Sequence, residues 1–151
     1  MTVPYSCDDC GDARATIGEQ IVHGRLHWSV SHSCAGTIVE ECGRDELPPG
    51  WRAALLARAG TYRLTIDRAA ARAAAMRVLR RRGVPLTDLA GTLTAGLSGT
   101  ETEMHLAALD FAAGGVPTTV SGPFAAGGVP TTVSGPFAAE GASTVSGPRT
   151  T

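Results

Sequence analysis

All four cysteines of this 151-residue chain lie within its first 42 residues, and their spacing is typical of a metal site. Cys7 and Cys10 form a Cys-x-x-Cys pair that is followed by Gly11. Such a pair on a tight turn directs two thiolates at one point, as half of a tetrahedral zinc site requires. Cys34 follows after a spacer of suitable length and offers a third thiolate. We therefore predict a structural zinc ion near the N-terminus.

The fourth ligand is open, because the second half of the site has no Cys-x-x-Cys pair. Cys42 is the first choice, His32 is the alternative, and His23 or His27 are further candidates. A disulfide is another use for these cysteines. We expect a cytoplasmic protein, in which metal binding is favoured over disulfides, because no secretory signal is recognisable after Met1. No 18-residue apolar run is found, so we expect no membrane partner.

Catalysis is not what these residues indicate, and we expect no enzyme activity. A catalytic zinc needs three protein ligands, an open position and a carboxylate base nearby. Glu40 and Glu41 are candidates for that base, yet two adjacent glutamates are more typical of a solvated strand edge. The sequence also contains no nucleophile elbow, phosphate loop or paired-acid motif.

Residues 1–47 are expected to form short strands and turns. The strands are predicted at 15–22, 26–30 and 37–41, with a hairpin turn at 23–25. So little sheet buries too little apolar surface to fold alone, and a metal would contribute much of its stability. The region is therefore predicted to be a small zinc-ribbon-like β module.

The next residues are predicted to form a linking helix and then a second domain. The link covers 48–60, with its helix over 51–59 and Trp51 as a core anchor. Residues 61–123 are expected to fold as a compact domain of β-α-α-β-α-β type, with helices on one face of a small antiparallel sheet. Its elements are a strand at 62–66, helices over 69–82, from 84 onward and over 100–113, and a strand at 116–120. The fold class is thus α+β.

The chain ends in a tandem repeat. The segment 111–123 recurs unchanged at 124–136, and a degraded copy covers 137–148. Gly, Pro, Ser and Thr dominate the repeat, so residues 124–151 are predicted to be a flexible low-complexity tail. The alternative is that a duplicate strand pairs at a sheet edge.

Four stretches of the second domain resemble the C-terminal domain of the bacterial ribosomal stalk protein of the L-seven/L-twelve type. They are 62–66, 78–89, 97–103 and 113–120, which match that domain's strands, glycine turns and serine-capped third helix. The resemblance implies the same α+β fold. It also implies that Arg77, Arg80 and Arg81 stand for part of the basic face that contacts translational GTPases. The second helix departs from the family, with Thr87 and Asp88 where the stalk domain has lysines.

Charge is divided between the two halves of the chain. Residues 1–50 contain three arginines and eight acidic residues, whereas residues 51–110 contain nine arginines and five. Arg72, Arg77, Arg80 and Arg81 share the polar side of one predicted helix and are candidates for partner binding. Alternatively, arginines near the end of a helix simply complement its dipole.

These patterns together predict a non-enzymatic adaptor or regulatory protein, in which a structural zinc site accompanies a small protein-binding domain. The alternative is a ribosome-associated or nucleic-acid-associated zinc-ribbon factor that uses the arginine face on RNA or DNA.

Overall fold

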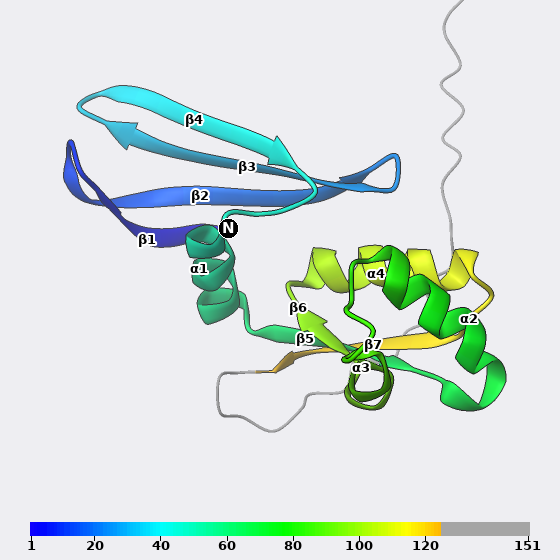
Figure 1. The fold of residues 1–151 in the computed structure, drawn as a ribbon. Coiled ribbons are helices and arrows are strands. Elements are labelled where there is room, and N and C mark those ends of the chain that lie inside the picture. The colour runs from blue at the N-terminus through cyan, green and yellow to red at the C-terminus, as the bar shows by residue number, and fades with distance from the viewer. Residues whose placement is uncertain (125–151) are drawn as a thin grey trace, which may run out of the picture.

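The computed structural model describes residues 1–124, which form two antiparallel sheets and four helices (Figure 1). The first part of the chain contains β1 (Thr2–Cys7), β2 (Gly11–Val22), β3 (Arg25–Cys34), β4 (Thr37–Arg44) and α1 (Pro49–Ala59). The second part contains β5 (Thr61–Ile66), α2 (Arg68–Arg81), α3 (Leu89–Ala95), β6 (Leu97–Gly99), α4 (Glu101–Ala113) and β7 (Thr118–Phe124). The α+β class and the β-α-α-β-α-β order of the second part are confirmed.

The first sheet is a meander with strand order β1-β2-β3-β4. Two-residue turns at His23–Gly24 and Ala35–Gly36 join its last three strands. All four turn residues have positive φ, between 48° and 83°, as the type I′ hairpin turn requires. The hairpin turn predicted at 23–25 is therefore confirmed.

Strand β1 was not indicated by the sequence pattern. Pro4 lies in its middle, and proline cannot donate a hydrogen bond to a neighbouring strand. β1 is an edge strand that pairs only with β2, however, with Pro4 opposite Arg14. An edge position tolerates proline because one side of the strand needs no donor.

Helix α1 covers one face of this sheet. Alternation along the strands places Val3, Ile17 and Val30 on that face, where they are buried together with Leu55 of the helix. Trp51, predicted to be a core anchor, packs at the margin of the same cluster. The segment predicted only to link two domains therefore also completes the core of the first.

The second sheet has strand order β6-β5-β7. Leu64 and Ile66 are two residues apart on β5 and so lie on one face, where they pack with residues of all three following helices. Phe111 of α4 is fully buried in this cluster. Helix α4 begins with the predicted capping box, in which Thr100 and Glu103 bind each other's backbone N–H.

The second helix of this domain begins later than the sequence pattern predicted. Helix α3 starts at Leu89 rather than near residue 84, and Leu86 is 71% exposed. Leu86 had the spacing of an apolar stripe with Leu89 and Leu93, but only the latter two are buried. Pro85 and the turn that follows it hold Leu86 outside the helix.

Polar contacts join the first sheet and α1 to the start of α4, which lies between the two sheets (Figure 1). Arg52 of α1 donates from Nε and Nη2 to the Glu103 carboxylate at 2.6 and 2.8 Å. The Thr100 hydroxyl donates to Glu19 of β2 at 3.2 Å. The two sheets are therefore connected through the capping residues of α4.

The predicted tail at 124–151 lies, apart from Phe124 at the end of β7, outside the described residues.

Candidate metal centre

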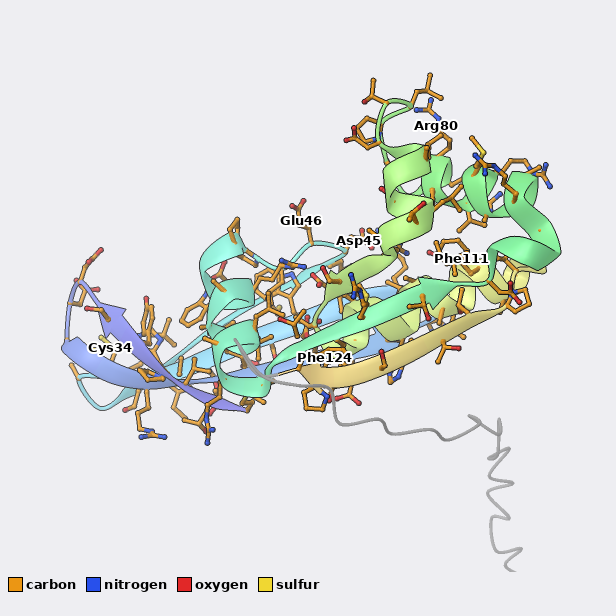
Figure 2. All side chains as sticks on the ribbon, turned by 90° about the horizontal axis from the view of Figure 1, so that it is seen from below. Cys34, Asp45, Glu46, Arg80, Phe111 and Phe124 are labelled. Atoms are coloured by element: carbon orange, nitrogen blue, oxygen red, sulfur yellow. The ribbon has the colours of Figure 1, made fainter. Side chains whose placement is uncertain are left out.

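Four side chains from two separate segments of the chain meet at the end of the first sheet that is remote from the second, where Figure 2 labels Cys34. Cys7 ends β1, and Cys10 lies in the turn before β2. His32 and Cys34 lie at the end of β3, two positions apart and therefore on the same face of the strand. Gly11 has a φ of 74°, which allows the chain to turn back directly after the Cys-x-x-Cys pair. The fold thus brings the β1–β2 turn and the end of β3 together.

The spacing of the four ligand atoms suits one metal ion. One atom from each of Cys7, Cys10, His32 and Cys34 lies within 4.8 Å of the others. The Cys7 and Cys34 sulfurs are 3.9 Å apart. Two sulfurs of a tetrahedral zinc site lie about 3.8 Å apart, because each is about 2.3 Å from the metal. A disulfide would need about 2.05 Å, and all four cysteines of the chain are free thiols.

His32 provides an independent sign that a ligand belongs here. Its Nε2 is buried, and nothing in the described part of the chain forms a hydrogen bond with it. A buried polar atom without a partner costs about 1–3 kcal/mol. The imidazole ring contacts Tyr5 edge-on, with centroids 5.0 Å apart, which restricts its orientation. A cation bound at Nε2 would give this buried nitrogen a partner.

The Cys-x-x-Cys turn stabilises a thiolate at Cys7. The backbone N–H groups of Asp9 and Cys10 donate to its sulfur and lower the pKa of Cys7 to about 7. The hydrogen bond with Cys7 is in turn the main reason that the pKa of Cys10 is raised to about 12. Because thiolates are the form that binds a metal, a divalent cation held by this pair would replace the proton of Cys10.

The surroundings of the cluster are negatively charged. Burial, followed by the charges of Cys7, Asp8, Cys10 and Glu41, raises the pKa of Tyr5. These groups come from three different segments, so their common effect on Tyr5 shows that they gather at one end of the sheet. A cation is the ligand that this environment favours.

The structure does not bring Cys42, the predicted fourth ligand, to the cluster. Cys42 pairs with Ser29 on β3, five positions before Cys34. An odd separation along a strand reverses the face, so Cys42 lies exposed on the side away from α1. The alternative ligand, His32, takes its place, because it is two positions from Cys34 and therefore shares its face.

The two trailing histidine candidates are also excluded from the cluster. His23 lies in the turn at the opposite end of the sheet. His27 pairs with Arg44 and lies on the same outer face as Ser29. His32 differs from both because it lies two residues before Cys34 on the same strand, so the two side chains share a face. A strand prediction that reached residue 34 instead of ending at 30 would have indicated this.

The predicted partner-binding arginines are exposed on α2, and Figure 2 shows that Arg80 lies far from Cys34. The structure places Arg72, Arg77, Arg80 and Arg81 in solvent. Arg82 beside them forms an ion pair with Asp110 of α4 and is thereby partly neutralised.

Comparisons of the chain with protein-family models, with curated proteins and with solved structures found no match. Among the helices described for residues 1–124, none has the length and apolar character needed to cross a lipid bilayer.

Proposed function

We propose that this protein is a non-enzymatic adaptor, in which a structural zinc ion holds the first sheet and the second domain binds a protein partner. The observation that carries the proposal is the convergence of Cys7, Cys10, His32 and Cys34 within 4.8 Å. Three thiolates and one imidazole form a soft donor set, which selects zinc over hard cations such as Mg²⁺ or Ca²⁺.

A structural role for the zinc ion is supported by the number of ligands. Four protein side chains fill a tetrahedral shell and leave no position for a water molecule or a substrate. The first sheet also needs the support, because its core rests on few large side chains, chiefly Ile17, Trp28 and Leu55. In small domains of this kind, the free energy of metal binding is largely free energy of folding.

The proposal is tested by measuring metal content and affinity in the full chain. Elemental analysis of protein purified without added metal is expected to give one zinc per chain. Cys34→Ser and His32→Ala are each expected to weaken zinc binding by at least about 100-fold in competition with a chromogenic chelator.

The chain supplies a matched control for each of these variants. Cys42→Ser removes an exposed cysteine of the same sheet, and His27→Ala removes a histidine of the same strand. Both are expected to retain one zinc with unchanged affinity. A chain without metal, or equal losses in the control variants, would contradict the proposed site.

The protein partner is proposed to bind the arginine face of α2, formed by Arg72, Arg77, Arg80 and Arg81. This proposal draws on the exposure of these side chains and on the resemblance to the ribosomal stalk domain. Replacing Arg77 and Arg80 by glutamate is expected to abolish capture of the partner from a cell extract. The same change at Arg58, in the last turn of α1, is the control.

The second candidate is a nucleic-acid-associated factor, which the four exposed cations also favour. Such binding is dominated by phosphate contacts and weakens steeply with salt. A random-sequence RNA and duplex DNA, titrated at about 50 and 200 mM salt, separate the two candidates. Tight binding that weakens by orders of magnitude between these concentrations would favour the nucleic acid over the protein partner.

A further inference from the structure

Strand β4 leaves one side of the first sheet without a partner. It is the outermost strand of the order β1-β2-β3-β4, and none of the described strands pairs with its far side (Figure 1). Every residue of β4 is exposed apart from the half-buried Gly43. The edge therefore faces solvent along the whole strand.

The register identifies which backbone groups point outward. The N–H of Asp45 donates to the Leu26 carbonyl, which makes these two residues a hydrogen-bonded pair. Such pairs alternate along an antiparallel ladder. Every second residue going back along β4 is therefore bonded to β3, and the residues between them direct N–H and C=O to the free side. These are Ile38, Glu40, Cys42 and Arg44.

The side chains at this edge are apolar as well as polar. Ile38 is 76% exposed and Val39 is 45% exposed, and they lie on opposite faces of the strand. An added strand could cover both of them, since its own side chains would alternate between the same two faces. A free edge with two exposed aliphatic side chains is the arrangement that strand addition uses.

The charge at the edge specifies the partner. Glu40 and Glu41 follow the two aliphatic residues, and Asp8 and Asp9 lie in the turn at the same end of the sheet. The ion pairs found among the described residues involve other carboxylates, so these four carry uncompensated negative charge. Complementary charge opposite them would have to be positive.

A second copy of this chain fits the edge less well. Two antiparallel registers let the outward backbone groups of β4 pair with those of a second β4 over the longest overlap. Like charges face each other in both registers. One register places Glu40 opposite Glu40 of the second copy, and the other does the same with Glu41. Like charges directly opposite on neighbouring strands are destabilising. Charged edges of this kind are a common protection against self-association.

We propose that the free edge of β4 binds an extended basic peptide, in which pairs of adjacent basic residues alternate with pairs of adjacent aliphatic residues, as a fifth strand of the sheet. The backbone of the peptide pairs with the outward groups of Ile38, Glu40 and Cys42. Its aliphatic side chains contact Ile38 or Val39, and its basic side chains lie beside Glu40 and Glu41. This surface is distinct from the arginine face of α2, which would select a partner of the opposite charge.

The proposal is tested with the full, metal-loaded chain and three labelled nine-residue peptides. The first alternates pairs of lysines with pairs of valines, and the second has glutamate in place of lysine. The third keeps the lysine–valine sequence but is N-methylated at every second residue, so that its charges remain and one line of backbone donors is lost. Fluorescence anisotropy is expected to detect binding of the first peptide, with at least about tenfold weaker binding of the other two.

Two variants of the protein complete the test. Glu40→Lys combined with Glu41→Lys is expected to reverse the preference toward the glutamate peptide, whereas Glu46→Lys, an exposed acid beyond the end of β4, leaves the preference unchanged. The proposal is overturned if the N-methylated peptide binds as well as its parent, or if Glu46→Lys reverses the preference equally. It is also overturned if sedimentation shows that the chain dimerises through this edge and excludes the peptide.

Discussion

The rings of Tyr5 and Trp51 contact each other with their centroids 4.6 Å apart and their planes tilted by 39°, and this contact joins β1 to α1 beside the candidate metal cluster. The same tyrosine ring lies edge-on to His32, one of the four candidate ligands. The helix therefore reaches the metal site through a single aromatic side chain. The metal and α1 are expected to stabilise each other, since both hold Tyr5 in place.

Trp51→Ala is expected to lower the free energy of unfolding of the first sheet and α1 by about 2 kcal/mol. It removes half-buried apolar surface and leaves Tyr5 without its contact to the helix. Zinc affinity should fall with it, and Trp51→Phe should recover most of both losses. Urea unfolding and chelator competition measure the two effects. An unchanged zinc affinity in Trp51→Ala would show that the contact between the two rings does not couple helix and metal.

Removal of the metal is expected to affect the two halves of the chain unequally. Chelation should abolish amide-exchange protection in residues 1–47, because the cluster joins the ends of β1 and β3. Protection in residues 61–120 should persist, because that region has its own apolar core around Phe111. Exchange measured by mass spectrometry with and without chelator checks this. Full protection of residues 1–47 after chelation would contradict a structural role of the metal.

Glu19 of β2, which contacts Thr100 at the start of α4, is expected to make the stability of the fold depend on pH. Burial is the main cause that raises the pKa of Glu19, so its charged form is less stable in the folded chain than in the unfolded one. Its contribution to stability is therefore present below its unfolded pKa and is lost as the pH rises through the folded value. Glu19→Gln keeps an acceptor for the Thr100 hydroxyl and avoids this loss.

The expected gain from Glu19→Gln at pH 7.5 is at most about 1 kcal/mol, since the side chain is only partly buried and solvent screens it. The gain should shrink as the pH is lowered through the raised pKa of the wild-type carboxyl, because that carboxyl then becomes protonated. Urea midpoints of both proteins at several pH values measure the difference. A gain that does not change with pH would assign it to packing rather than to ionisation.

The later start of α3 predicts opposite outcomes for two leucines that have the same place in the apolar repeat. Leu89→Ala is expected to cost about 2–4 kcal/mol of stability, because the side chain is 2% exposed. Leu86→Ala should change stability by no more than about 0.5 kcal/mol, because that side chain is 71% exposed. Thermal or urea unfolding of the two variants is sufficient. Similar losses in both would place Leu86 in the core after all.

Local signals in the sequence predicted the fold well where neighbouring residues decide the structure. The capping box at Thr100 and Glu103 and the hairpin turn at 23–25 are of this kind, since each depends on side chains within a few positions. The sequence pattern did not indicate β1, because Pro4 disfavours a strand at any position except the edge of a sheet. Whether a strand lies at an edge follows only from the tertiary arrangement.

The candidate metal ligands also divide into residues that a local motif predicts and residues that only the tertiary arrangement decides. Cys7 and Cys10 follow from a local motif, and Cys34 from the count of thiols. The choice between His32 and Cys42 depends on strand register, because one residue of displacement moves a side chain to the other face. The register of β3 and β4 is set by the two-residue turn at Ala35–Gly36, which no pattern in the sequence indicated.

The outward position of Cys42 has a practical consequence. Once a metal occupies the other three cysteines, Cys42 is the one thiol of the chain left for a maleimide reagent. It lies on the face opposite α1, so a dye attached there leaves the core undisturbed. A single-site conjugate of the unmodified sequence can thus serve as an optical sensor for molecules that approach this strand.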